Sequence, residues 1–163
     1  MTIVNPKHIV KEIGSLIGVE IEDSDIATAH KLPDSKKVKN RMIVKFLQRD
    51  KREEVYKKRT NLVGKNTSHL PSQSVAETSA GNSRIYINES LTNYRKRLFG
   101  RIKECKQKNN VKYLWTSYGK TMLKVNETST TEAFTTHEEF EDYLDQISNG
   151  EQTRVNIIFS EVM

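Results

Sequence analysis

The sequence predicts an α+β fold made of two small domains, and three observations lead to this prediction. Helical and strand patterns follow one another in the order helix–strand–strand–helix–strand and then helix–hairpin–strand–helix. Residues 64–83, GKNTSHLPSQSVAETSAGNS, are rich in Ser, Thr, Asn and Gly and are typical of a mobile loop or linker. Residues 111–125, VKYLWTSYGKTMLKV, have the alternation and the central turn of a β-hairpin.

The first domain is predicted to span residues 1–88 and to begin with a helix. Asn5 is a typical N-cap, Pro6 is favoured at the first helical position, and Gly18 is typical of the residue that ends a helix. Only the four residues MTIV precede this helix, so we expect the domain to lack an opening strand. Strands are expected at residues 26–32, 41–47 and 84–88, and a basic loop at residues 33–40 joins the first two of them. Asp50 and Glu53 have the spacing of a capping box, which predicts a helix to about Thr60.

The second domain is predicted to span residues 89–147. Thr92 is expected to cap a helix that runs to about Lys108. The apolar stripe of this helix is Tyr94, Leu98, Ile102 and Cys105. The hairpin follows, then an edge strand at residues 132–135. A helix then begins at Thr136, with Glu139 three residues later as in a capping box, and runs to Ile147. Its inward residues are expected to be Phe140, Tyr143, Leu144 and Ile147, and residues 148–163 are expected to form a tail.

The positive charge of the chain is concentrated in its middle. The net charge is +6, but residues 31–124 hold 24 Lys and Arg against 7 Asp and Glu, whereas residues 125–163 hold 1 against 9. A segment this basic is typical of a surface that neutralises phosphates and releases their counterions. The alternative is an ordinary solvated surface of lysines. We favour a polyanionic partner, because unneutralised charge of this size repels itself.

Two segments of the first domain supply candidate contacts to a nucleic acid. Strand 41–47 places Ile43, Lys45 and Leu47 on one face, which suits either an open sheet surface or the edge of a central strand. The K/R-G-F/Y-G/A-F-V-x-F/Y pattern of RNA-recognition sheets is absent, so we do not expect bases to stack on this strand. The helix that follows carries a cluster of cations, which could equally be a solvated face: Arg49, Lys51, Arg52, Lys57, Lys58 and Arg59.

The second domain supplies the stronger candidates. Arg95, Arg97 and Arg101 lie on the helix before the hairpin, and arginine suits phosphate because it is planar and always charged. In the hairpin, Tyr113 and Trp115 share one face, and bases stack on such aromatic side chains without sequence preference. Tyr118, beside the turn glycine, is expected to be exposed, and Lys120 and Lys124 are the nearby cations. Trp115 could instead belong to the core of a small domain, which burial statistics favour.

Several classes of protein are not supported by the sequence. No GxSxG, HExxH or Walker pattern occurs, so we expect neither an enzyme nor a cofactor. The single cysteine, Cys105, excludes an internal disulfide, and the four scattered histidines have no zinc-site spacing. No apolar run is long enough for a membrane span, and the first residues do not form a signal peptide.

The order of five segments resembles a known family. These segments are SDIATAHKLP, RMIVKFLQRDKREEVYKKR, RIYINESLTNYRKRLFGRIKE, KYLWTSYGKTMLKV and FTTHEEFEDYL. Together they are similar to the RNA-binding core of the first-reading-frame proteins of non-LTR retrotransposons, and also to the related few-polyhedra proteins of baculoviruses. The resemblance covers nearly all of residues 5–147. It implies a truncated RNA-recognition-motif-like sandwich over residues 1–88, followed by a small α+β C-terminal domain with a β-hairpin.

The resemblance also implies a function without catalysis. Proteins of the retrotransposon type bind single-stranded RNA or DNA with little sequence preference and act as annealing chaperones in a cytoplasmic ribonucleoprotein, with a nuclear location as an alternative. Residues of this chain that match the family's basic positions are Lys31, Arg41, Lys45, Arg95 and Arg97, together with the hairpin. The family's trimerising coiled coil is not found in this sequence, so we expect a monomer. The alternative is a protein-interaction module of a viral structural or regulatory protein of the few-polyhedra type.

Overall fold

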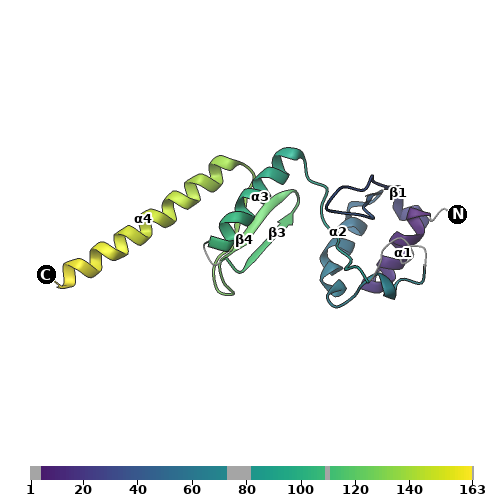
Figure 1. The fold of residues 1–163 in the computed structure, drawn as a ribbon, viewed down its shortest axis with the longest axis horizontal. Coiled ribbons are helices and arrows are strands. Elements are labelled where there is room, and N and C mark those ends of the chain that lie inside the picture. The colour runs from purple at the N-terminus through teal and green to yellow at the C-terminus, as the bar shows by residue number, and fades with distance from the viewer. Residues whose placement is uncertain (1–4, 73–81, 109–110, 163) are drawn as a thin grey trace. The chain divides into compact units, whose positions relative to one another are not determined.

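The computed structural model describes residues 5–72, 82–108 and 111–162, with side chains for these except residues 107 and 150–162. The chain divides into two compact units, Met1–Asn88 and Glu89–Met163, which we call unit 1 and unit 2 (Figure 1). Helices and two small antiparallel sheets occur in the described residues, so the predicted α+β class is confirmed.

Unit 1 begins with the helix that the sequence predicts. Its elements are α1 (Pro6–Ile17), β1 (Ile26–Lys31), β2 (Met42–Phe46), α2 (Arg49–Lys57) and the 3-10 turns η1 (Asp23–Asp25), η2 (Lys58–Leu62) and η3 (Thr67–His69). The Asn5 side chain accepts a hydrogen bond from the Lys7 amide at 3.0 Å, and Gly18 has a φ of 78° just after α1. Local cap chemistry therefore fixes both ends of α1.

The core of unit 1 lies against one face of the two-stranded sheet. Strands β1 and β2 pair antiparallel, with Ile26 opposite Phe46 and Ala29 opposite Val44. These four side chains pack with buried residues from both helices and from the turn after α1. The buried members of this cluster are Val10, Ile17, Val19, Ile21, Ile26, Val55 and Leu62. The other face of the sheet therefore remains outside this core.

Three side chains that are distant in sequence donate hydrogen bonds to carbonyls at the C-terminal end of α1. The Lys65 ammonium donates to the Leu16 carbonyl at 2.7 Å, and the Asn61 amide donates to the Ile17 carbonyl at 3.0 Å. The Lys58 ammonium donates to the Gly18 carbonyl at 3.1 Å. Cations are favourable at a helix C-terminus, where the last carbonyls lack partners and the dipole is negative. Two of the lysines of unit 1, Lys58 and Lys65, therefore have a structural role at the end of α1.

Gly14 is the residue of α1 at which a methyl group should be most damaging. A Cβ built on Gly14 would lie 2.7 Å from the Val19 carbonyl oxygen and 2.7 Å from Ile21 Cδ1. We expect Gly14→Ala to lower the free energy of unfolding by about 1–2 kcal/mol, because overpacking outweighs the helix propensity gained. Urea denaturation measures the change.

Gly100 provides the matched control for that substitution. It also lies in a helix, but a Cβ on Gly100 meets no atom within 4 Å. Gly100→Ala should therefore stabilise the protein by up to about 1 kcal/mol. Equal effects of the two substitutions would contradict the close packing of α1 against the turn at Val19.

Two predicted features of unit 1 are wrong. The residue before α2 is Gln48, not Asp50, and it makes no side-chain capping bond. Glu53 instead pairs with Arg49 one turn earlier, at 2.7 Å. Within the described residues 82–92 no strand forms, because Arg84 makes only an isolated bridge with Asn66, although Ile85 and Ile87 pack against the core. Residues 73–81 of the predicted mobile loop lie outside the described residues.

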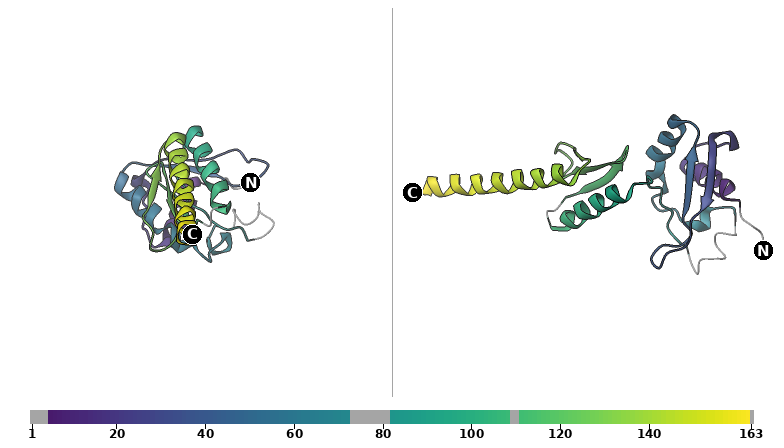
Figure 2. Two further views of the ribbon diagram at one scale, coloured as in Figure 1. Left: turned by 90° about the vertical axis from the view of Figure 1, so that its left-hand side faces the viewer. Right: turned by 90° about the horizontal axis from the view of Figure 1, so that it is seen from above.

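Unit 2 packs two helices against one face of a three-stranded sheet. Its elements are α3 (Asn93–Lys108), β3 (Tyr113–Ser117), β4 (Lys120–Lys124), β5 (Glu132–Phe134) and α4 (His137–Val162). The strand order is β3-β4-β5, all antiparallel. Figure 2 shows α3 running along one face of this sheet. The buried residues of its core are Leu98, Ile102, Val111, Leu123, Phe134 and Phe140.

Both helix starts of unit 2 follow the predicted caps, but one predicted helix end is wrong. The Thr92 hydroxyl accepts from the Arg95 amide at 3.3 Å. Thr136 and Glu139 form a reciprocal capping box, with the Thr136 hydroxyl accepting from the Glu139 amide and the Glu139 carboxylate accepting from the Thr136 amide, each at 3.2 Å. Helix α4 continues to Val162 rather than ending at Ile147. The segment expected to be a tail is thus part of this helix.

The Glu139 carboxylate makes the stability of unit 2 sensitive to acid. Its pKa is lowered from the ordinary 4.5, first by hydrogen bonds from the Thr135 amide and hydroxyl and also by the positive charge of Lys120. The ionised form is thus favoured in the folded state, so its contribution is complete above the unfolded pKa and is lost as pH falls through the lower folded pKa. We expect part of the loss of stability below about pH 4.5 to disappear in Glu139→Gln. Denaturant titrations at a series of pH values, with Glu138→Gln as the control, measure this difference.

Candidate nucleic-acid interface

The face of the unit 2 sheet opposite the core combines aromatic side chains with lysines. In the β3–β4 pair Tyr113 is opposite Lys124, Trp115 is opposite Met122, and Ser117 is opposite Lys120. Directly opposed residues share a face of the sheet. We call these six residues the aromatic face. The alternate residues Leu123 and Thr121 are buried on the other face, at 2 % and 1 % exposure.

Trp115 therefore does not belong to the core. It is half-buried, and it is absent from the cluster of buried and partly buried residues that pack beneath the sheet. Tyr113 is 37 % exposed. Neighbouring residues on one face of a strand are about 6.7 Å apart, so the two rings offer successive positions along β3. The interpretation of Trp115 as a core residue is wrong, and the arrangement can hold flat ligands near positive charge.

The turn that joins β3 and β4 is held by two charged side chains. Tyr118 and Gly119 have φ values of 51° and 72°, which are typical of a two-residue type I′ hairpin turn. The Arg95 guanidinium donates to the Gly119 carbonyl at 2.6 Å, and the Glu89 carboxylate accepts from the Gly119 amide at 3.2 Å. Tyr118 is 53 % exposed, as the sequence predicts. Arg95 therefore positions the hairpin, and its guanidinium is already engaged.

The other two arginines of α3 differ from each other. Arg101 forms an ion pair with Glu141 of α4, and each side chain is 47 % exposed. Arg97 is exposed, and its Nε donates to the Asn93 carbonyl of its own helix at 3.4 Å. Arg97 thus keeps the most hydrogen-bonding capacity for a phosphate, since a guanidinium has five N–H donors.

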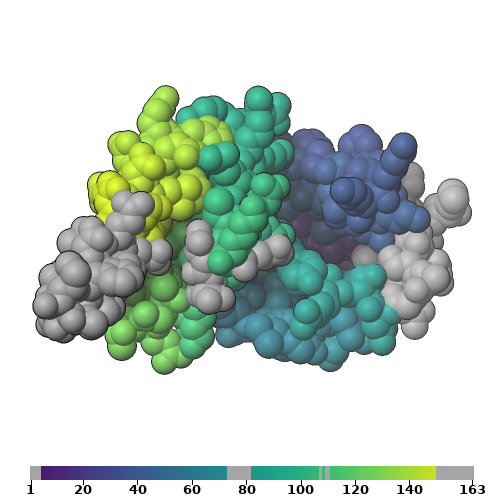
Figure 3. Space-filling model, turned by 60° about the vertical axis from the view of Figure 1, so that its left-hand side comes forward, coloured from purple at the N-terminus to yellow at the C-terminus, as the bar shows by residue number. Residues whose placement is uncertain are grey.

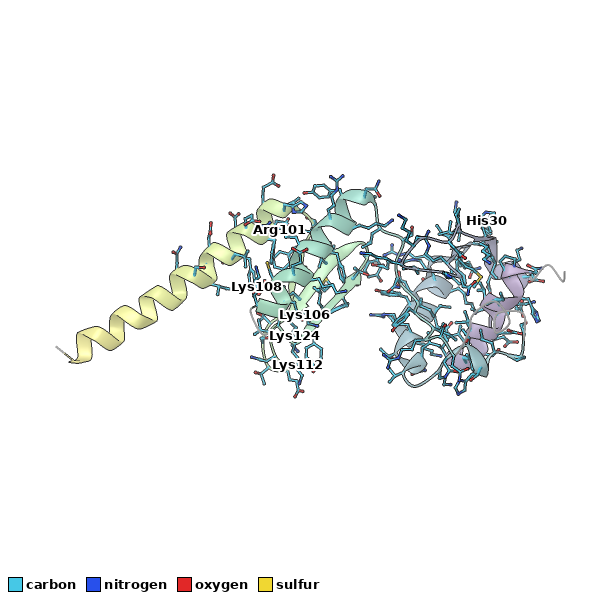
Figure 4. All side chains as sticks on the ribbon, in the orientation of Figure 1. His30, Arg101, Lys106, Lys108, Lys112 and Lys124 are labelled. Carbon is cyan, nitrogen blue, oxygen red and sulfur yellow. The ribbon has the colours of Figure 1, made fainter. Side chains whose placement is uncertain are left out.

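Lys112 illustrates how a cation beside the aromatic face can be neutralised. Its ammonium pairs with Glu127 and lies 5.3 Å from the centre of the Tyr113 ring. The hydrogen bond to Glu127 raises the pKa of Lys112, and the interaction with Tyr113 adds to this effect. Among the described residues Lys124 has no hydrogen-bond or ion-pair partner, whereas the charge of Lys120 acts on the Glu139 carboxylate without a direct ion pair. Figure 4 labels Lys112 and Lys124 on the hairpin.

Unit 1 offers a second open sheet face. Lys45 is opposite Thr28, and Ile43 is opposite His30, on the face away from the core. Ile43 is 38 % exposed and Leu47, just beyond β2, is 66 % exposed, which agrees with an open sheet surface, one of the two alternatives for this strand. The aromatic side chain of β2, Phe46, packs against the core and does not lie on this face. This face can contact phosphates through Lys45, and its ring is the exposed His30 imidazole rather than a Tyr or Trp side chain.

The remaining sequence-predicted residues of unit 1 are not brought together. Lys31 is exposed but lies opposite Met42, so it does not share a face with Lys45. Arg41 donates to the Pro33 carbonyl at 2.6 Å. On α2, Arg49 pairs with Glu53, and Lys58 pairs with Glu54 in addition to closing α1. Arg59 lies 3.8 Å from the centre of the Tyr56 ring, and Arg52 lies 6.0 Å from it.

The tip of the β1–β2 hairpin carries three cations that were not predicted from the sequence as contacts to a nucleic acid. The tip is ordered by hydrogen bonds from the Ser35 amide to the Val38 carbonyl at 2.9 Å and from the Asn40 amide to Asp34 at 2.9 Å. Its three lysines are exposed and have no partner among the described residues: Lys36, Lys37 and Lys39. The run KKVKN was the signal that could have identified them.

Other kinds of site are not found in the part of the chain that the structure describes. No group of His, Cys, Asp or Glu side chains there is arranged to hold a metal ion. No helix in the described ranges combines the length and the apolar character needed to cross a bilayer.

Comparisons with known proteins give one match. Residues 92–143 match the family described as Baculovirus FP protein domain 2. These residues include α3, the hairpin, β5 and the start of α4. The match supports the resemblance to the few-polyhedra proteins over this part of unit 2. No curated protein and no solved structure matches the chain.

Proposed function

We propose that the chain binds single-stranded nucleic acid without sequence preference and acts as an annealing chaperone of the retrotransposon type. The observation that carries this proposal is the aromatic face of unit 2. Bases stack on Tyr113 and Trp115, and the phosphates on either side contact Lys120 and Lys124. The proposed activity is binding, and RNA in a ribonucleoprotein is its expected ligand.

The chemistry of the face explains why sequence preference should be weak. Every base has a π-face, so stacking tolerates any sequence, and ammonium groups contact phosphates that are the same at each nucleotide. Reading a base requires hydrogen bonds to its edge. On the aromatic face the neutral hydrogen-bonding groups are the Ser117 and Tyr113 hydroxyls and the Trp115 indole N–H. The Tyr113 hydroxyl already donates to the Glu127 carboxylate at 3.4 Å, so few groups remain to read a base edge.

Fluorescence anisotropy with a labelled single-stranded RNA of about 20–30 nucleotides tests the proposal, since stacking sites of this kind cover about 4–16 nucleotides. We expect log Kd to rise linearly with log salt concentration, with a slope of about 0.7 for each phosphate neutralised. Single strands of different sequence should compete equally, and duplex should compete less well. Loss of the complex to an acidic polypeptide at equal charge would overturn the nucleic-acid proposal.

Removing the two lysines of the aromatic face should change the salt dependence. We expect Lys120→Gln with Lys124→Gln to weaken binding to all single strands by a similar factor and to lower the salt slope by about 1.4, for two lost phosphate contacts. Lys103→Gln is the control, because Lys103 is exposed on α3, the helix that covers the opposite face of the sheet. An unchanged slope in the double variant would place the phosphate contacts elsewhere.

A protein-interaction module is the second candidate function, and the match to a baculovirus FP domain favours it. The basic surface would then meet an acidic partner protein, and the acidic start of α4 would be a second docking face. The competition arm of the anisotropy experiment separates the two candidates. Preference for an acidic polypeptide over RNA supports the protein partner.

A further inference from the structure

Unit 2 contains a cavity of about 450 Å³ that the proposed function does not use. It lies between the end of α3, the inner side of the hairpin and the first turns of α4. Figure 3 shows these three elements next to one another on one side of unit 2. The cavity is on the core side of the sheet, since Leu123 lines it, and is thus separated by the sheet from the aromatic face.

The walls of the cavity are mostly apolar. Leu123 and Phe140 form part of the buried core, at 2 % and 1 % exposure. Val125 and Ile147, also in the lining, are 37 % and 39 % exposed, so the apolar surface continues to the solvent. Cavities of about 300–1,000 Å³ with predominantly apolar walls are typical of small-molecule sites.

Two lysines add positive charge to the lining. Lys106 and Lys108, from the last turn of α3, line the cavity and have no hydrogen-bond or ion-pair partner among the described residues. Two other cations of unit 2 are paired with carboxylates: Arg101 with Glu141, and Lys112 with Glu127. Figure 4 labels Lys106 and Lys108 at this end of α3. Unpaired ammonium groups beside apolar walls are complementary to a ligand with an anionic head and an apolar body.

The size and the lining of the cavity argue against a helix, an extended peptide or a nucleobase as its ligand. A helix with its side chains is about 10–12 Å wide, too wide for a cavity of this volume. An extended peptide needs a free strand edge, but both edges of β4 are paired. A nucleobase has polar edges that are costly to bury unpaired, and the remaining polar groups in the lining are the Tyr143 hydroxyl and the weakly donating Cys105 thiol.

We propose that this cavity binds a long-chain carboxylate, with the aliphatic chain among the apolar side chains and the carboxylate at Lys106 and Lys108. Burial of the chain supplies affinity in proportion to its length, because each methylene group removed from water contributes a similar amount. The two ammonium groups give preference for an anionic head.

Isothermal titration calorimetry of the full chain with dodecanoate, decanoate and octanoate tests the proposal. We expect saturable binding of one dodecanoate, and about 10- to 15-fold weaker binding for each pair of methylene groups removed. Dodecyltrimethylammonium, with the same chain length and a cationic head, should bind at least about tenfold more weakly than dodecanoate.

Variants identify the site. Lys106→Gln with Lys108→Gln should weaken dodecanoate binding by at least about tenfold, and Lys103→Gln should leave it within about twofold. Ile147→Trp, at an exposed position of the lining, should block the cavity with little risk to folding, which circular dichroism checks. Unchanged binding in both the Lys106/Lys108 and Ile147 variants, or equal binding of the cationic amphiphile, would overturn the proposal.

A competition experiment keeps this proposal separate from the nucleic-acid proposal. Single-stranded RNA should not displace dodecanoate, because the two ligands are assigned to opposite faces of the sheet. Displacement by RNA would overturn the carboxylate site as a separate site. Failure of dodecanoate to bind, with RNA binding intact, would overturn this proposal alone.

Discussion

Replacing Trp115 by Ala should weaken binding to single-stranded RNA by about 5- to 150-fold, because one stacked base contributes about 1–3 kcal/mol. Tyr113→Ala should have an effect in the same range, and the double variant should lose more than either. Trp115 lies on the face of the sheet away from the core, so the loss should occur without unfolding of unit 2. Anisotropy at a fixed salt concentration measures the change, and circular dichroism confirms the fold.

Two further variants make this prediction specific. Trp115→Phe should keep most of the affinity, since a phenyl ring still stacks. Tyr86→Ala removes an aromatic ring that is 70 % exposed in unit 1, and it should leave affinity unchanged. If Trp115→Ala binds RNA as well as Tyr86→Ala does, the aromatic face is not a stacking surface.

Replacing Phe140 by Ala should lower the free energy of unfolding of unit 2 by about 3–5 kcal/mol. Phe140 is 1 % exposed, and its ring meets Phe134 edge-on at 5.3 Å between centroids and stacks near Tyr143 at 6.4 Å. The substitution removes these contacts and leaves a void that a sheet and two helices cannot easily fill. Denaturant titration followed by the fluorescence of Trp115, the only tryptophan of the chain, reports on unit 2.

Ile147→Ala is the control for Phe140→Ala because it lies on the same helix. Ile147 is 39 % exposed, so its truncation should cost less than about 1 kcal/mol. A loss from Phe140→Ala as small as that from Ile147→Ala would mean that α4 does not close the core of unit 2.

Features set by neighbouring residues could be predicted from the sequence. The start of α1 follows from the Asn5 cap, and its end from a left-handed glycine at Gly18. The capping box of Thr136 and Glu139 and the turn at Tyr118 and Gly119 are likewise local. The Asp50 box is the exception, because helix α2 begins two residues earlier than this box predicts and Glu53 pairs with Arg49 instead.

Features set by distant contacts could not be predicted. Alternation in the hairpin places Tyr113 and Trp115 on one face, but only the packing of α3 and α4 decides which face is covered. Arg95 is bonded to a carbonyl 24 residues away, and Arg101 is paired with Glu141 on another helix. A count of charges therefore overestimates the number of cations that can bind phosphate. Lys120 and Lys124 are better candidates for phosphate contacts than Arg95 and Arg101, whose guanidinium groups already have partners.

The hydrogen bonds to the last carbonyls of α1 also have a consequence for synthesis on the ribosome, because their donors are made later than the helix. The carbonyls of Leu16, Ile17 and Gly18 receive donors that follow them by 49, 44 and 40 residues. At elongation rates of about 5–20 residues per second, the end of α1 waits about 2–10 seconds for these donors to be made. During that interval only local bonds, including the Asn5 and Gly18 caps, are available to α1, and a helix of 12 residues is marginal on such bonds alone.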